Sequence, residues 1–147
     1  MSEYSNFPID FLSRTIENIE NYQGPFETTN LINNCLGLIL IPRQYLISKL
    51  PPLSIFDFIE ELEFSNQIQV FEAQDNYSLI KIFTHIRNGI AHGRIEQISQ
   101  DGEIVGVKIS DRYSDIHPEN FTIELLIPQF KKICIKISNY FLTEYNQ

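Results

Sequence analysis

The stretch that decides the fold is residues 76–95, which read NYSLIKIFTHIRNGIAHGRI. Its apolar residues recur at the helical spacing of three and four: Leu79, Ile82, Phe83, Ile86 and Ile90. Asn76 or Ser78 can cap the start of this helix, and Gly93 is a suitable C-terminal stop. The pattern predicts an amphipathic helix that packs along one side on the protein core.

The other side of the predicted helix is polar: Lys81, His85, Asn88 and His92, with Arg87 at the border. No acidic residue occurs between Asp75 and Glu96, although the chain holds 19 acidic and 11 basic residues and has a formal net charge of -8. That charge argues against a general, charge-driven nucleic-acid binder but leaves room for a compact phosphate site. The acid-free helix is therefore the candidate functional element.

Composition indicates one globular domain over residues 1–147, since 43% of the residues are hydrophobic and 20% charged. Cys35 and Cys134 lie in apolar contexts and are expected to be buried, reduced thiols. Nothing resembles a metal-binding cluster or a signal peptide, and the apolar run at residues 35–42 is too short to span a bilayer. A cytoplasmic protein without a metal or another cofactor is expected, and no membrane partner.

Two helices are predicted before the central one, at residues 8–22 and 30–40. Thr28 and Thr29 are candidate caps of the second helix, and Pro42 should end it. This second helix is apolar on most of its circumference, so it should lie at the centre of the bundle. Its Asn33 and Asn34 are expected to form interhelical hydrogen bonds or to be exposed.

Ser54 is a candidate cap for a further helix at residues 55–62. Residues 64–73 fit a strand or a loop as well as a helical turn. After the central helix, β-branched residues flank Asp101-Gly102, a strong hairpin signal, and residues 121–123 fit a third short strand. A last helix is predicted at 125–145, with this stripe: Leu126, Phe130, Ile133, Ile137 and Phe141. The predicted fold is mainly α, a bundle of about four to five helices with a small β-hairpin before the last helix.

The central helix ends in Arg87-Asn88-Gly89-Ile90-Ala91-His92, an R-N-x-x-x-H pattern followed by a glycine. At this point the sequence resembles the HEPN superfamily, whose signature is an arginine, a polar residue and, a few residues later, a histidine near the end of a bundle helix. Over the rest of the chain the resemblance rests on helix order and size.

The resemblance implies a HEPN-like bundle and a metal-independent ribonuclease, commonly a dimeric toxin or abortive-infection (anti-phage defence) effector. It also implies RNA as substrate, an antitoxin or inhibitory partner, and Arg87, Asn88 and His92 as the catalytic set. In such enzymes the RNA 2′-hydroxyl attacks the adjacent phosphate and leaves a 2′,3′-cyclic phosphate and a 5′-hydroxyl.

The chemistry of these residue types agrees with that expectation. A histidine side chain ordinarily titrates near pH 6.5 and can move protons at neutral pH. The planar, permanently charged guanidinium of Arg87 suits a pentavalent phosphorane, and Asn88 can orient His92 or donate to the phosphate. Arg87 and His92 lie about 140° apart around a helix axis, so one helix cannot direct both at one phosphate. Two copies related by a two-fold axis can form a composite site, which favours a homodimer.

Simpler roles compete with these. Arg87 can be a surface ion-pair partner, and His92 a C-terminal cap that interacts with the helix dipole. His85 is expected to be an exposed or interface histidine, with an auxiliary catalytic role as the alternative. Together with Lys81 and Arg94 it is predicted to contact RNA. Arg112 and Tyr113 also suit RNA contacts, but the sequence does not separate them from ordinary loop residues.

Two functions from different classes remain open. The first is the endoribonuclease, and the second is a catalytically silent HEPN-type module that dimerises or binds a nucleotide or protein partner. The intact Arg87, Asn88 and His92 favour the enzyme, whereas the net acidic charge favours the silent module. A DNA-binding regulator is not supported, because no basic recognition helix is present.

Overall fold

The computed structural model describes residues 6–42, 44–59, 68–70 and 77–145. The elements within these residues are, in order, α1 (Phe7–Asn21), α2 (Glu27–Leu40), α3 (Gln44–Ile47), α4 (Ile55–Phe58), β1 (Ile68–Val70), α5 (Leu79–Ala91), β2 (Ile95–Gln100), β3 (Glu103–Asp111), β4 (Phe121–Leu126) and α6 (Ile127–Tyr145). The prediction of a mainly α protein is confirmed.

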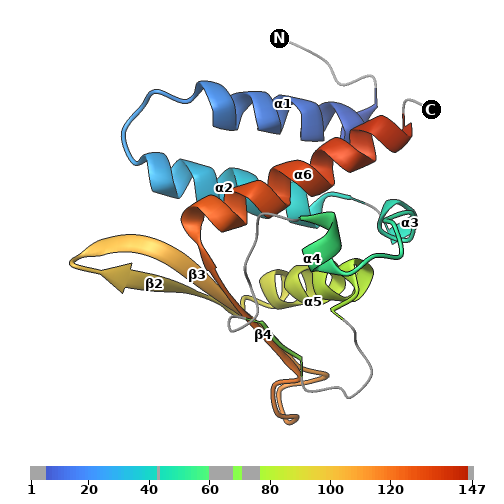
Figure 1. Cartoon of the computed structure of the whole chain (residues 1–147). Helices are drawn as coiled ribbons and strands as arrows, with labels where there is room; N and C mark the ends of the chain where they lie inside the picture. The colour runs from blue at the N-terminus through green and yellow to red at the C-terminus, as the bar shows by residue number, and fades with distance from the viewer. Residues whose placement is uncertain (1–5, 43, 60–67, 71–76, 146–147) are drawn as a thin grey trace.

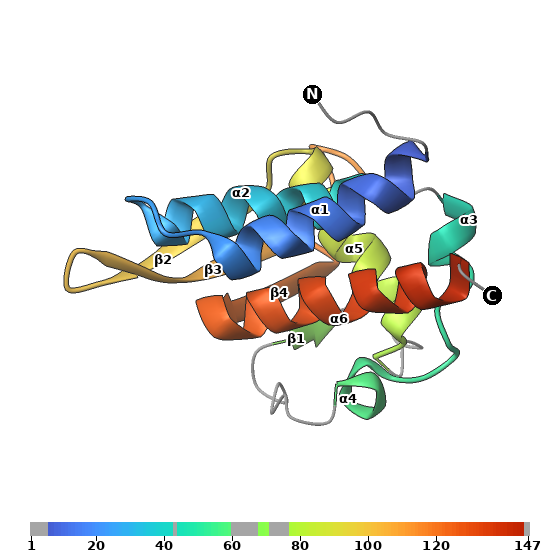
Figure 2. The same cartoon turned by 90° about the horizontal axis from the view of Figure 1, so that it is seen from above.

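The long helices α1, α2 and α6 pack against one another on one side of the sheet, and α1 lies over α2 and α6, away from the sheet (Figures 1 and 2). Helix α5 contacts α2 on one side and β3 on the other. One face of the sheet is buried, because residues from cross-strand pairs of β3 and β4 all point to the helices: Val107 with Leu125, Ile109 with Ile123, and Asp111 with Phe121. Two of these pairs are wholly apolar, and the third places a carboxylate at the end of the buried face.

The predicted hairpin is confirmed but is only part of the sheet. Strands β2 and β3 are joined at Asp101 and Gly102, whose φ angles of 53° and 82° suit the mirror-image turns that hairpins favour. The sheet is antiparallel with four strands in the order β1-β4-β3-β2. The third short strand predicted at residues 121–123 is confirmed as part of β4, which pairs with β3. The prediction of a small hairpin alone is corrected, since the three-residue β1 also pairs with β4.

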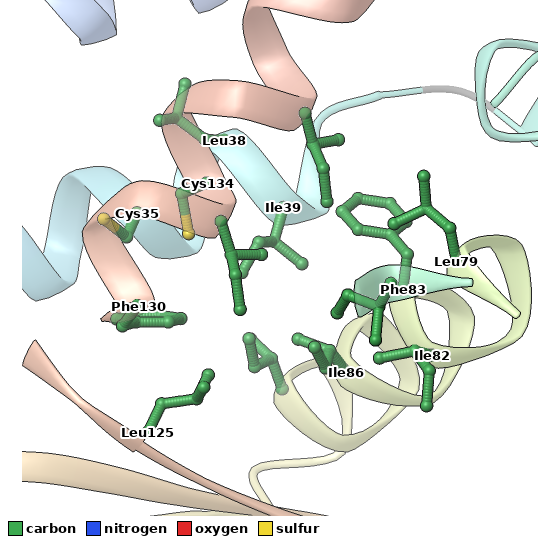
Figure 3. Close-up of a cluster of buried hydrophobic side chains, with 14 of the residues drawn as sticks. Cys35, Leu38, Ile39, Leu79, Ile82, Phe83, Ile86, Leu125, Phe130 and Cys134 are labelled. Carbon is green, nitrogen blue, oxygen red and sulfur yellow. The ribbon is translucent and has the colours of Figure 1, made fainter. Parts of the chain in front are cut away.

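The apolar stripe of α5 is buried as predicted. Figure 3 shows Ile82, Phe83 and Ile86 of α5 in one cluster of buried side chains with Leu38 and Ile39 of α2, and all five side chains are about 1% exposed. Because these contacts come from both helices, α5 is anchored to the bundle by its apolar side.

Cys35 of α2 and Cys134 of α6 are buried, free cysteines whose side chains lie together in the core (Figure 3). Burial, and then the hydrogen bond to Cys35, raise the pKa of the Cys134 thiol well above its ordinary value. The prediction of buried, reduced thiols is confirmed.

Several local predictions are corrected. Helix α2 begins at Glu27, so Thr28 and Thr29 lie inside its first turn; its N-cap is Phe26, which has a left-handed φ of 58°. Leu126 belongs to β4 and is 49% exposed, because α6 begins one residue later. The rest of the predicted stripe of α6 is buried.

Other local predictions hold. Asn34 accepts a hydrogen bond from Asn18 of α1 across 3.1 Å, and Asn33 is exposed. Ser54 caps α4 by accepting from the Asp57 N–H at 3.1 Å. Predictions that fall on residues 60–67 and 71–76, including the end of the 55–62 helix and a cap at Asn76, lie outside the described residues. Among the described helices, none combines the length and hydropathy that a bilayer crossing needs.

Candidate active site

The exit from α5 is fixed by backbone geometry. His92 is the C-cap, its N–H donates to the Asn88 carbonyl at 3.0 Å, and Gly93 follows with a left-handed φ of 71°. The predicted stop at Gly93 is confirmed. Ser78 is the N-cap by position, but its side chain makes no capping hydrogen bond.

Two further hydrogen bonds fix this exit, the first to α5 itself and the second to β3 of the sheet. The Arg94 N–H donates to the Gly89 carbonyl at 2.7 Å, and the Ser110 N–H donates to the Arg94 carbonyl at 3.1 Å. A Cβ on Gly89 would overlap the Ser110 carbonyl oxygen and lie 2.7 Å from Ile109 Cγ2. Only a glycine lets α5 approach β3 this closely. The polar face of α5 is thereby set against the end of β3.

His85 lies over the last cross-strand pair of the buried sheet face. Its Nδ1 is 2.8 Å from Oδ2 of Asp111, and its ring stacks on Phe121 with centroids 4.8 Å apart and planes 8° from parallel. The side chain is only 13% exposed, so of the two expected positions, exposed or at an interface, the exposed one is wrong. It was based on helix periodicity, which does not include the sheet that covers this position.

The carboxylate of Asp111 is held from several sides and is 5% exposed. Its Oδ1 accepts from the Arg112 N–H at 2.9 Å and from the Arg94 guanidinium at 3.4 Å. Arg94 also lies 3.2 Å from Oδ1 of Asp115. Arg94 therefore supports the carboxylate that holds His85, and its own charge is largely compensated by two acids.

These contacts border a cleft of about 320 Å³. Its lining comes from α5, from the end of β3 and from the following loop: His85, Asn88, His92, Asp111, Arg112, Tyr113 and Asn120. The Nε of Arg112 is buried and has no hydrogen-bond partner among the described residues. A buried guanidinium nitrogen of this kind suits an anionic ligand.

The structure brings some of the predicted site residues together and separates others. His85, Asn88 and His92 share one helix face at spacings of three and four residues and all line the cleft. Arg87 is half-buried and does not line it, since the side chain emerges about 140° from His92. Lys81 is exposed toward the start of α5, and neither it nor Arg94 lines the cleft.

Sequence reasoning missed Asp111 and Asn120, and the sequence does hold a signal for the first. Val107, Ile109 and Asp111 alternate on one face of β3, so an acid occupies a position that the pattern assigns to the core. A buried acid needs a partner. Asn120 gives no comparable signal. The described residues contain no group of three or more His, Cys, Asp or Glu that could hold a metal ion.

A family model described as HEPN pEK499 p136 matches residues 1–147. The chain therefore belongs to this HEPN family, which confirms the resemblance of its motif. At the level of the family, HEPN domains include ribonucleases and toxin-like modules. No curated protein and no solved structure matches the chain.

Proposed function

We propose that this protein is a metal-independent endoribonuclease that cleaves RNA by transesterification in a site shared by two copies of the chain. The observation that carries the proposal is that Asn88 and His92 of the HEPN motif line one polar cleft at the end of α5. In the reaction, the 2′-oxygen bonds to the adjacent phosphorus as the bond to the 5′-oxygen breaks. The products carry a 2′,3′-cyclic phosphate and a 5′-hydroxyl.

Each motif residue has a role that its position permits. His92 is exposed beside the cleft and accepts the proton of the 2′-hydroxyl. Asn88, one helical turn earlier on the same face, donates to a phosphate oxygen or orients the sugar. Arg87 stabilises the charge of the phosphorane.

Arg87 does not line the cleft that His92 lines, so a second copy of the chain must supply the arginine. If two α5 helices face each other about a two-fold axis, each can direct its Arg87 at the cleft of its mate. Lys81 and Arg112 then add positive charge for the RNA backbone, which a chain with a net charge of -8 otherwise lacks. Two further residues were predicted as RNA contacts. His85 lines the cleft, and Arg94 lies beside it, against Asp111.

We further propose that the protein acts as a toxin or anti-phage defence effector restrained by an antitoxin or another inhibitory partner. Membership of a family that includes toxin-like modules supports this context. Induced expression should then slow bacterial growth, whereas expression of the His92→Ala variant should not.

The deciding experiment incubates purified protein with total RNA in EDTA, beside Arg87→Ala and His92→Ala. Cleavage in EDTA, with cyclic-phosphate ends and loss in both variants, is the expected result. An oligonucleotide whose 2′-hydroxyl at the cut site is replaced by hydrogen should be bound but left whole. Cleavage of that oligonucleotide, or complete loss of cleavage in EDTA, would contradict the mechanism.

The second candidate is a silent HEPN module that binds a nucleotide or a protein partner, and the net acidic charge favours it. Under this alternative the cleft still binds a phosphate through Arg112, but the wild-type protein leaves RNA intact. Nucleotide binding by calorimetry without any RNA cleavage would support the silent module over the enzyme.

A further inference from the structure

The proposed reaction uses His92 but leaves the second histidine of the cleft, which is firmly held, without a role. His85 is fixed at one ring nitrogen by the carboxylate of Asp111, at 2.8 Å, and at one ring face by Phe121. Asp111 can only accept a hydrogen bond from this ring, so the proton of a neutral His85 resides on Nδ1. The other nitrogen, Nε2, has no partner among the described residues and is the atom that can exchange a proton.

Both histidines can act on the same phosphodiester. They line one cleft and lie seven residues apart on one face of α5, or about 10.5 Å along the helix axis. Asp111 and Phe121 hold the His85 ring in place, so the exposed His92 side chain is the one that turns toward a phosphate held between the two histidines. Arg112 lines the same cleft, and its guanidinium, whose Nε is buried without a hydrogen-bond partner among the described residues, offers donors for that phosphate.

We propose that His85, held by Asp111, is the second proton-transfer residue of this site and protonates the departing 5′-oxygen. The inference rests on the proposed ribonuclease function. As His92 takes the proton of the 2′-hydroxyl, the 2′-oxygen bonds to phosphorus. The bond from phosphorus to the 5′-oxygen then breaks, and that oxygen receives the proton of His85 Nε2. Afterwards His92 gives its proton to water and His85 takes one from water, so both residues return to their starting states.

Asp111 is the positioning residue in this scheme. It keeps the Nδ1 proton in place, orients Nε2 toward the cleft and compensates the charge of the imidazolium before transfer. Its own position is fixed by the Arg112 N–H and by Arg94. The site therefore holds one anchored histidine and one exposed histidine, which suits a donor that must be aligned with the leaving group.

The test uses one oligonucleotide that the wild-type protein cleaves, made with either oxygen or sulfur at the 5′ position of the cut bond. A thiolate leaves without being protonated, so the sulfur form needs no general acid. His85→Ala should cleave the oxygen form roughly 10²–10⁴-fold more slowly than wild type and the sulfur form within about threefold of it. His92→Ala should slow both forms, because the 2′-hydroxyl must lose its proton in each.

Because His85 is partly buried, His85→Asn accompanies His85→Ala. The amide of asparagine can still donate to Asp111 but cannot transfer a proton, and thermal unfolding checks that each variant is folded. Asp111→Asn should slow the oxygen form and spare the sulfur form, which a merely structural defect would not do.

The outcomes separate the two proposals. If wild type cleaves no RNA in the total-RNA assay, so that no such oligonucleotide can be chosen, the ribonuclease function is wrong, and the role of His85 with it. If wild type cleaves both forms but folded His85 variants slow neither, or slow both equally, His85 is not the general acid and the ribonuclease function stands. Selective loss on the oxygen form supports the role of His85.

Discussion

The two sides of α5 are held by different kinds of interaction. On the core side, Ile82, Phe83 and Ile86 are each 1% exposed and pack among residues of other elements. On the cleft side, His85 has one carboxylate and one ring as partners, and His92 is exposed. The core side fixes where the helix lies, so the residues on the cleft side need not contribute to stability. Stability and activity should therefore respond to different substitutions on one helix.

The largest expected difference between the effect on activity and the effect on stability is at His92, the exposed histidine on the cleft side of α5. His92→Ala should lower the rate of RNA cleavage by roughly 10²–10⁴-fold, because a proton acceptor is lost. The free energy of unfolding should change by no more than about 0.5 kcal/mol, since the residue is exposed. His117→Ala is the matched control: this exposed histidine lies outside the cleft, beside Ser114, and its loss should leave cleavage unchanged. An unfolded His92→Ala would show that the two sides are not independent.

The opposite result is expected on the core side. Ile86→Ala should destabilise the protein by about 2–5 kcal/mol, because it removes a fully buried side chain and leaves a cavity. Urea titration followed by circular dichroism measures this cost. Cleavage by the folded fraction should remain within a few-fold of wild type. A cost below about 1 kcal/mol would mean that this side does not anchor the helix.

A smaller effect is expected where α5 touches β3. Gly89→Ala should cost roughly 1–3 kcal/mol, since the added methyl group overlaps the Ser110 carbonyl and must push the helix away from the sheet. Such a shift also moves His85 away from Asp111, so cleavage should fall as well. Gly93→Asn is the control, because asparagine tolerates the left-handed φ of 71° and nothing lies near the position. If Gly93→Asn lost as much stability and cleavage as Gly89→Ala, the way the helix ends, and not its close approach to β3, would be what these glycines are needed for.

The sequence predicted the core side better than the cleft side, and the reason is physical. The stripe of α5, the hairpin at Asp101-Gly102 and the burial of the cysteines follow from local periodicity and turn chemistry. Strand β1 was not firmly predicted, because three residues hold little periodicity and their partner β4 lies far along the chain. The same limit applies to the site. Its motif is local and could be recognised, whereas the contact of His85 with Asp111 spans 26 positions and exists only after β3 and β4 pair.

The smallest expected effect concerns Cys134 of α6, a titratable group buried in the core on which the apolar side of α5 packs. Burial raises the pKa of this thiol above its ordinary value near 8.5. Below that pH the thiol is protonated in both the folded and the unfolded chain, so it adds no pH dependence. As the pH rises further, only the unfolded chain ionises, and stability should fall by at most about 1.4 kcal/mol per pH unit.

Urea titrations between pH 7.5 and 10 measure this slope, and Cys134→Ala should reduce it. The same burial should protect both cysteines from alkylation in the native protein, with reaction only after unfolding. The cleft should behave differently, because the His92 imidazole is exposed and open to a histidine-modifying reagent in the native state. Rapid alkylation of the thiols in native protein would mean that the packing of α2 against α6 opens readily. The core would then be as accessible to reagents as the cleft, which contradicts the difference proposed between them.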